Sequence, residues 1–236
     1  MPTKSSYQRA LQTLQQQVIA CRRCPQLVRY CRQVARDKRR MYRDEEYWGK
    51  PVPSFGDPAA ELLILGLGPA AHGANRTGRM FTGDRSGQFL YRALYEAGFA
   101  SQPESHHRDD GLRLQNCYIT ASLRCAPPKN KPLPEELGNC QPYLEEELRL
   151  LKRVRAVLAL GRIAFESYLR VAGKRKDFPR RSSLRFAHGG SYQLPGGLPR
   201  LFASYHPSQQ NTQTGRLTPE MFQKVLDDVR RFLAAP

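Results

Sequence analysis

Side chains suited to acid–base and stacking chemistry are concentrated in one glycine-rich segment, Gly66–Gly87. Glycines let the backbone approach a ligand closely. The segment also contains a histidine, an amide, two arginines, an aromatic ring and a carboxylate: His72, Asn75, Arg76, Arg79, Phe81 and Asp84. A solvated surface loop would not explain so many reactive side chains in one place. A dinucleotide-binding loop is disfavoured because the G-x-G-x-x-G spacing and a phosphate-loop lysine are absent.

Two later segments have the same character. Leu123–Pro132 is stiffened by prolines and places Asn130 between two lysines. Tyr205–Thr214 begins with a histidine, His206, that is followed directly by Pro207. A lone histidine is more often structural than catalytic. This one leaves an aliphatic run and enters a rigid proline turn, which would hold a catalytic group still.

The elements that must position these segments alternate along the chain. Four short aliphatic runs predict buried strands, at Glu61–Gly66, Cys117–Ser122, Ala156–Gly161 and Leu201–Tyr205. Helical patterns lie before, between and after them, from Ser5 to about Val34, over residues 89–99, from Pro134, over Arg162–Val171 and from Thr218. We therefore expect an α/β fold, a three-layer α/β/α sandwich with a central four-stranded, mainly parallel sheet, in a single domain of residues 1–236. Functional loops of such sheets gather at the carboxyl ends of the strands.

The charge of the chain indicates an anionic polymer as partner. Lysine and arginine number 38 against 21 acidic residues, for a net charge of +17. Two blocks, Arg29–Arg43 and Arg170–Arg185, carry seven basic residues each, and phosphate binding explains them better than a solvated face does. The longest apolar stretch, Leu62–Leu67, is too short to span a membrane, and the polar start, Met1–Gln17, predicts no secretory signal.

Six cysteines without a secretory signal argue against a disulfide framework. Cys21 and Cys24 form a C-x-x-C pair, and Cys125 and Cys140 form a looser one. Four thiolates suit zinc and an iron–sulfur cluster equally well, so the spacing alone leaves both open. The other two, Cys31 and Cys117, are expected to be ordinary buried thiols.

Three ordered segments carry a resemblance to a known family. GLGPAAHGANRTGRMFTGDRSG, LRCAPPKNKP and SYHPSQQNTQTGR resemble the signature segments of family 5, or type b, uracil-DNA glycosylases, the iron–sulfur type of the uracil-DNA glycosylase superfamily. The similarity extends from Cys21 to the last helix. It departs from the family at Gly68, where alanine is usual, and this difference affects backbone contacts without removing side-chain chemistry.

The resemblance implies hydrolysis of the N-glycosidic bond of uracil in DNA, which leaves an abasic site. It implies that Asp84 positions and activates water or stabilises the sugar cation. It places His206 against a carbonyl oxygen of the base. Asn130 is a further candidate for positioning the substrate. Phe81 offers a stacking face for the flipped base, and the backbone at Gly66 and Gly68 contacts the pyrimidine.

Substrate range and cofactor are also implied by the resemblance. Other families of the superfamily place an asparagine at the end of the second strand, where this chain has Ala121. Losing that amide weakens discrimination between bases, so we expect other deaminated bases such as hypoxanthine to be accepted. The resemblance favours a structural [4Fe–4S] cluster, with the ligands Cys21, Cys24, Cys125 and Cys140.

We expect a monomer that acts on damaged DNA in the cytoplasm, at the nucleoid. A non-catalytic iron–sulfur or zinc module that binds nucleic acid is the main alternative. It explains the charge and the cysteines but not the loops that contain Asp84 and His206. A nucleotide-using α/β enzyme is disfavoured by the absent phosphate-loop spacing.

Overall fold

The computed structural model describes residues 4–175, 178–180 and 183–235. At its centre lies one mixed sheet with the strand order β1-β3-β2-β4-β6-β5. The strands are β1 (Phe55–Gly56), β2 (Leu62–Gly66), β3 (Cys117–Ala121), β4 (Ala156–Leu160), β5 (Ser191–Tyr192) and β6 (Arg200–Ser204). The four predicted strands are its parallel centre, β3-β2-β4-β6, so the α/β class is confirmed.

The expected count of four strands is wrong, because the sheet has six within the described residues. The additional strands, β1 and β5, lie at the two edges and pair antiparallel with β3 and β6. Each has only two residues, which is too short for any alternation of apolar and polar side chains to show in the sequence. Their pairing with the neighbouring strand, rather than a local pattern, makes them strands.

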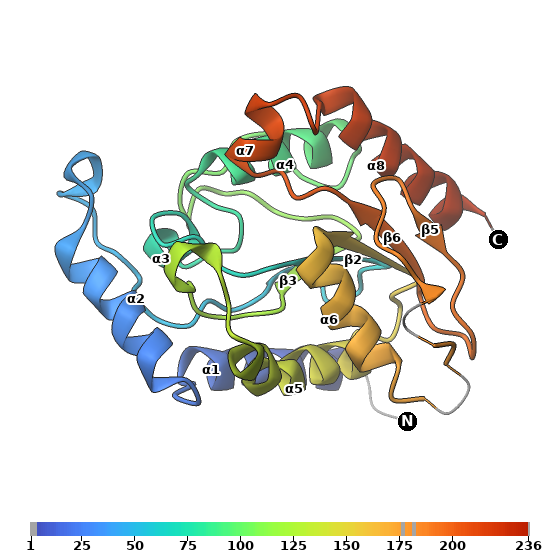
Figure 1. The fold of residues 1–236 in the computed structure, drawn as a ribbon, viewed down its shortest axis with the longest axis horizontal. Helices are drawn as coiled ribbons and strands as arrows, with labels where there is room; N and C mark the ends of the chain where they lie inside the picture. Colours follow the sequence, from blue (N-terminus) through green and yellow to red (C-terminus); the bar gives the residue numbers. More distant parts are fainter. Residues whose placement is uncertain (1–3, 176–177, 181–182, 236) are drawn as a thin grey trace.

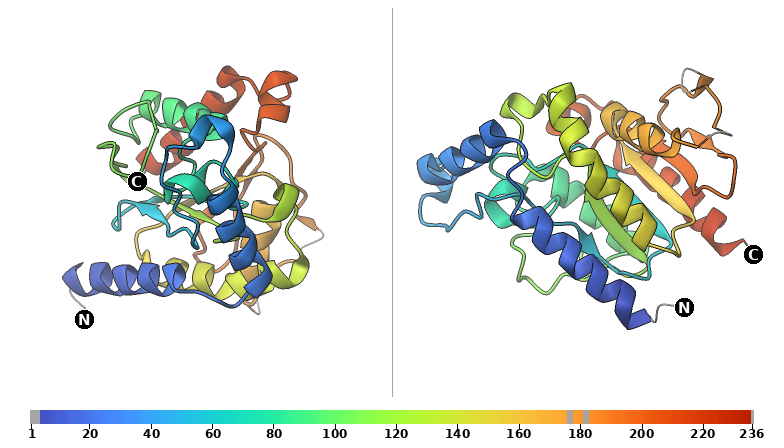
Figure 2. Two further views of the ribbon diagram at one scale, coloured as in Figure 1. Left: turned by 90° about the vertical axis from the view of Figure 1, so that its left-hand side faces the viewer. Right: turned by 90° about the horizontal axis from the view of Figure 1, so that it is seen from below.

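Helices flank both faces of the sheet (Figures 1 and 2). One face carries α1 (Lys4–Ile19), α5 (Pro134–Leu150) and α6 (Arg162–Ala172), and the other carries α4 (Arg85–Glu96) and α8 (Pro219–Ala234). The shorter elements are α3 (Ala74–Thr77), α7 (Gln209–Gln213) and the 3-10 turns η1 (Arg40–Tyr42) and η2 (Pro128–Asn130). In the part of the chain that the structure describes, no helix has the length and apolar character needed to cross a bilayer.

The central strand β2 shows how the sheet separates two cores. Leu62 and Ile64 belong to the cluster beneath α4 and α8, whereas Leu63 and Leu65 belong to the cluster beneath α1, α5 and α6. Successive side chains of a strand point to opposite faces, so a continuous aliphatic run fills both cores. The apolar run therefore predicts a strand that is covered on both sides.

The predicted helix from Ser5 to about Val34 is two helices, α1 and α2 (Pro25–Asp37), with a break between them. Pro25 stands in the first turn of α2, where the missing N–H of proline costs no hydrogen bond. The break contains Cys21 and Cys24. Beyond it, α2 packs near α3 and stands away from the sheet (Figure 1).

Candidate active site

A groove of about 1200 Å³ opens at the carboxyl edge of the parallel strands. The loops after β2, β3, β4 and β6 each contribute to its wall. Five residues suffice to show this: Phe81 and Asp84 follow β2, Asn130 follows β3, Gly161 follows β4 and His206 follows β6. The edge at which the sequence predicts functional loops is therefore the edge at which the groove lies.

Phe81 lies in the groove only because two positions near it are glycine. A Cβ at Gly66 would stand 2.8 Å from the tip of the Phe81 ring, and one at Gly87 would stand 1.7 Å from the Phe81 carbonyl oxygen. Phe81 itself has a φ of +53°, a conformation that is unfavourable for a bulky side chain. The surrounding segment thus forces the ring into a strained position, as functional sites often do.

Asp84 occupies the N-cap position of α4, where its Oδ1 accepts the N–H of Gly87 at 2.9 Å. Its other oxygen approaches Gly73 so closely that a Cβ there would lie 2.0 Å from Oδ2. Burial raises the pKa of Asp84, and the N–H groups of Gly87 and Ser86 and the charge of Arg76 oppose this. Asp84 is therefore held in place at the N-terminus of α4, on the wall of the groove.

His206 follows β6 and stacks against Phe81, with ring centroids 5.7 Å apart and an angle of 29° between the ring planes. Burial lowers the pKa of His206 to about 4, so the ring is neutral near pH 7. The backbone is held as well, because the carbonyl of His206 accepts from Asn211 Nδ2 and from the Ser208 amide, each at 2.8 Å.

Asn130 lies exposed on the groove wall in the turn η2. Both it and Lys129 have positive φ values, +56° and +54°. Asparagine tolerates this conformation better than most residues, whereas lysine does not. The prolines around this turn restrict the alternatives and hold the amide at the groove.

Two predicted base-binding positions, Gly66 and Ala121, are buried and do not line the groove. Ala121 ends β3 opposite Gly66 and is only 2% exposed, within the core beneath α4 and α8 rather than on the groove wall. Gly68 lines the groove, and a Cβ there would stand 3.0 Å from the Cβ of Leu123. The family's usual alanine would therefore require Leu123 to shift by a few tenths of an ångström.

Arg79 does not face the groove. Its guanidinium is 3% exposed and makes two bonds to Asp110, at 2.8 and 2.7 Å, and a third to Thr82 Oγ1 at 2.8 Å. Burial raises the pKa of Asp110, but the hydrogen bonds from Arg79 outweigh it and hold that pKa well below its usual range. Arg79 ties the loop before α4 to the Arg108–Asp110 segment.

Arg76 and Asn75 also bond to other parts of the protein and do not line the groove. Arg76 donates to the carbonyls of His72 and Gly83 at 2.9 and 2.7 Å, pairs with Glu45, and lies 3.9 Å from the ring centre of Tyr42. Asn75 is fully buried, and its Nδ2 donates to the carbonyls of Cys31 and Ala71, each at 3.3 Å. These side chains join the loop to the region around α2.

His72 lines the groove, and its Nδ1 lies 3.1 Å from the hydroxyl of Tyr47. Burial lowers the pKa of His72, and the nearby Arg39 and Arg76 lower it further. This histidine is therefore a neutral hydrogen-bonding group beside the predicted catalytic residues.

One wall of the groove is missing from the sequence-based list of site residues. It comes from α2 and η1 and consists of Tyr30, Arg39, Met41 and Tyr42. Met41 is 71% exposed, while Tyr42 is fixed beneath Arg76. The signal for this wall was the basic block Arg29–Arg43, which indicated a phosphate-binding surface but not its place beside the catalytic loops.

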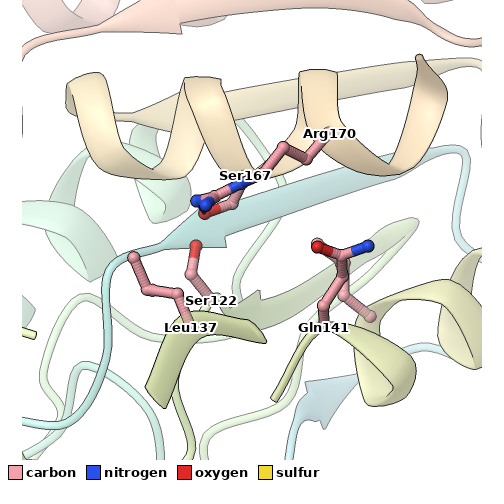
Figure 3. Close-up of a pocket in the computed structure, with 6 residues that line it drawn as sticks. Ser122, Leu137, Gln141, Ser167 and Arg170 are labelled. Carbon is pink, nitrogen blue, oxygen red and sulfur yellow. Dashed lines mark hydrogen bonds between the residues drawn. The ribbon is translucent and has the colours of Figure 1, made fainter. Parts of the chain in front are cut away.

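The second basic block lies elsewhere. Of its seven basic residues, Lys176 and Arg181 fall outside the described residues, and none of the other five lines the groove. Arg170 borders a separate cavity of about 10 Å³ between α5 and α6, where it donates to Ser167 (Figure 3). That cavity has room for about one water molecule. Lys174 pairs with Glu145 at 2.5 Å.

The four cysteines of the predicted ligand set come from the α1–α2 break (Cys21, Cys24), the loop after β3 (Cys125) and α5 (Cys140). Burial, with a smaller contribution from the nearby Cys21, raises the pKa of Cys24 and raises that of Cys140 to about 11. Asn139 Nδ2 donates to the Cys24 Sγ at 3.4 Å. Among the described residues, no three His, Cys, Asp or Glu side chains converge closely enough to hold a single metal ion.

As predicted, the remaining thiols, Cys31 and Cys117, are both fully buried, and Cys31 interacts with Cys125. Cys117 begins β3. The Cys31 Sγ accepts the Ala126 amide at 3.3 Å.

The chain is similar in sequence to known proteins of one superfamily. The sequence profile of the uracil DNA glycosylase superfamily matches residues 53–230. The type-5 uracil-DNA glycosylase of Thermus thermophilus is 56% identical over 92% of this chain and 95% of its own length. That of Mycobacterium leprae is 50% identical over 92% of this chain and 93% of its own length. A type-4 uracil-DNA glycosylase of Pyrobaculum aerophilum is 30% identical over 69% of this chain and 74% of its own.

The profile covers all four central strands and the loops that carry Asp84, Asn130 and His206. The N-terminal segment that contains Cys21 and Cys24 precedes residue 53 and lies outside it. The type-5 relatives nevertheless match over about nine tenths of the chain. The chain therefore belongs to the uracil-DNA glycosylase superfamily and, within it, to the type-5 family.

Proposed function

We propose that this chain removes uracil, and other deaminated bases such as hypoxanthine, from DNA by hydrolysing the N-glycosidic bond. The observation that carries the proposal is the meeting of an aromatic ring, a neutral imidazole and a fixed carboxylate in one open groove, in Phe81, His206 and Asp84. A base must leave the stack before it can react, so the site needs a surface that receives it. Family membership supports the same reaction.

The stacked pair binds and polarises the base. A base that stacks on Phe81 comes within reach of His206, because the two rings lie 5.7 Å apart. The neutral imidazole has one N–H to donate to a carbonyl oxygen of the base. As the glycosidic bond breaks, negative charge develops on the base, and a preorganised donor stabilises that charge. The half-buried ring is already stacked on Phe81, so it needs no reorganisation at that moment.

Asp84 acts on the sugar side of the same bond. With Oδ1 held by the Gly87 amide, Oδ2 remains to orient a water molecule or to stabilise the developing oxocarbenium ion. The adjoining Gly73 leaves room for this oxygen. Because every substrate base is attached to the same sugar, this role does not depend on the base.

Base selectivity comes from the backbone rather than from an amide side chain. The backbone at Gly68 contacts the pyrimidine, Gly66 supports it from the end of β2, and Asn130 positions the substrate from the groove wall. Ala121 offers no hydrogen-bonding side chain at the end of β3. A site without that amide discriminates less sharply, which extends its substrates to hypoxanthine.

DNA approaches along the wall formed by α2 and η1. Arg39 lines the groove there, and the block Arg29–Arg43 surrounds it with further basic residues. Phosphate contacts of this kind supply affinity and orientation without sequence specificity. That the chain acts as a monomer, in the cytoplasm at the nucleoid, stays a prediction.

Cys21, Cys24, Cys125 and Cys140 would hold a [4Fe–4S] cluster of structural function. Their thiols interact electrostatically with one another and lie partly or fully buried, with an amide donor from Asn139. Four thiolates suit a zinc ion and a [4Fe–4S] cluster alike, and membership of the type-5 family favours the cluster. The cluster would link α2 and α5 to the loop after β3.

The ligand set is tested by metal analysis of anaerobically purified protein. Cys24→Ala should lose iron and inorganic sulfide and should unfold at a lower temperature. Cys117→Ala, a buried thiol outside the set, should keep its iron. Stoichiometric zinc without iron in the unmodified protein would exclude the cluster.

The activity is tested with an oligonucleotide that contains one uracil, incubated with the protein and then cleaved with alkali at the abasic site. Cleavage is expected with the unmodified protein and should fall steeply with Asp84→Asn. A non-catalytic binding module would retard the same oligonucleotide on a gel without producing abasic sites. That outcome would replace the proposed activity.

A further inference from the structure

A second histidine holds the residue that precedes His206. The amide of Tyr205 donates to Nδ1 of His188 at 3.3 Å. The two rings also stack, with centroids 5.0 Å apart and 13° between their planes. His188 lies in the segment before β5 and does not line the groove. It contacts the start of the His206 loop without reaching the substrate.

The hydrogen bonds of His188 define one tautomer. Burial lowers its pKa, and a hydrogen bond to the backbone carbonyl of Met221, in α8, raises it in part. Since Nδ1 accepts from the Tyr205 amide and also lies 3.3 Å from Ser204 Oγ, the proton of the neutral ring resides on Nε2, the nitrogen that is left for Met221. The neutral ring therefore bridges the β6 exit and α8, with one nitrogen for each.

Further contacts hold Tyr205 and His206 in place. The guanidinium of Arg216 lies 4.5 Å from the ring centre of Tyr205. Beyond it, the His206 carbonyl accepts from Asn211 and Ser208. Hydrogen bonds therefore hold this pair of residues at both ends, at the amide of Tyr205 and at the carbonyl of His206. The His206 ring, which stacks on Phe81, has little freedom left except rotation of its own side chain.

We propose that His188 is a positioning residue for His206, acting through the hydrogen bond from the Tyr205 amide to Nδ1. This inference rests on the proposed function of His206 as a donor to the leaving base. A donor must stand close to where charge develops, and misplacement by about 1 Å can cost on the order of a hundredfold in rate. The alternative is a purely structural role, in which only the bond to Met221 matters.

Two substitutions separate these roles because each keeps one half of the imidazole. His188→Asn places an oxygen near the position of Nδ1, so the Tyr205 amide keeps its acceptor while the bond to Met221 is lost. His188→Gln places an amide near Nε2, so Met221 keeps its donor while the acceptor for Tyr205 is lost. Single-turnover excision at saturating enzyme reports the chemical step, and the melting temperature reports the fold.

For a positioning role, His188→Gln should slow uracil excision roughly tenfold to a hundredfold. His188→Asn should recover most of that loss, even where its melting temperature is the lower of the two. The opposite order, with Gln active and Asn slow, would assign His188 to the fold and overturn the proposal. Equal rates in both variants would overturn it as well.

A double-mutant cycle with His206→Ala gives an independent readout. If His188 acts through His206, adding His188→Gln to His206→Ala should change the rate little further, because coupled residues are not additive. Additive losses would contradict the proposal. The proposed function is tested by a different result. If the unmodified protein leaves uracil in place in the same assay, the activity is refuted, whereas the coupling between His188 and His206 is tested only by the variants.

Discussion

The Gly66–Gly87 segment presents two sets of side chains that look alike in the sequence and differ in the structure. Phe81 and Asp84 face the groove, and one oxygen of Asp84 is left for a substrate or water. Arg76 and Arg79 turn away, and their guanidinium groups bond to carboxylates of distant segments, Arg76 also to carbonyls of its own loop. The two sets differ in whether their polar atoms already have partners.

This difference separates catalysis from stability within one loop. Side chains whose hydrogen-bonding capacity is used by the protein maintain the loop, and their loss leaves buried partners without a bond. Side chains that keep a polar atom or a ring face free can serve the reaction. Substitutions in the first set should therefore lower stability, and those in the second should lower the rate of excision. Five experiments test this division.

The largest effect is expected from Asp84→Asn. It removes the charge but keeps a residue that caps helices well, so α4 should remain intact. Loss of a general acid–base group typically costs 10²–10⁴ in rate, and uracil and hypoxanthine should be affected alike. Single-turnover rates on both substrates measure this. Asp109→Asn, an exposed carboxylate outside the groove, is the control. Full activity in Asp84→Asn would remove this residue from the mechanism.

Arg79→Met should act on stability instead. Breaking a buried ion pair leaves Asp110 without its partner and typically costs about 3–5 kcal/mol of the free energy of unfolding. Urea denaturation measures this cost. The control is Arg92→Met, which breaks an exposed pair with Glu96 and should cost about 1 kcal/mol or less. Equal costs in the two variants would show that the Arg79 pair does not maintain the loop.

His206→Ala should lower the rate by roughly two to three orders of magnitude, or about 2.7–4 kcal/mol. If His206 contacts the leaving base as proposed, the loss should differ between uracil and hypoxanthine, in contrast to Asp84→Asn. The exposed His107 provides the matched control, His107→Ala. A loss independent of the base, combined with a base-dependent loss in Asp84→Asn, would reverse the two assignments.

The pH dependence of stability gives a subtler test of the buried His206. Its pKa is about 4 in the folded chain, below the ordinary value of 6.5. Between those values the unfolded chain binds more protons, so the free energy of unfolding should fall as the pH is lowered from 6.5 towards 4. His206→Phe keeps a ring against Phe81 but does not titrate. Its stability should decline less over this range, and an identical decline would show that His206 is not held neutral.

The smallest effect concerns DNA affinity. If Arg39 contacts a phosphate, Arg39→Gln should make the log–log slope of affinity against salt shallower by about 0.9. Arg185→Gln, from the second basic block and outside the groove, should leave the slope unchanged. Equal changes in both variants would place DNA on both blocks. No change with Arg39→Gln would exclude the α2–η1 wall as its path.

Local patterns in the sequence were sufficient for the central fold. Aliphatic runs of about five residues predict β2, β3, β4 and β6 because a strand buried on both faces has no polar side to show. The starts of α5 and α8 follow from Pro134 and Pro219, each in the first turn of its helix. Once these strands are parallel, the loops with Asp84 and His206 must share one edge of the sheet.

The sequence could not show which polar side chains are already bonded. Arg79 finds its partner 31 residues away in Asp110, and Asn75 finds a carbonyl 44 residues away at Cys31. The edge strands and the groove wall formed by Tyr30, Arg39, Met41 and Tyr42 likewise depend on contacts between distant segments. Residue type and spacing determined the chemistry that is available. Tertiary packing alone decided which of those groups remain free to perform it, because a buried polar group must bond to whatever the fold brings within reach.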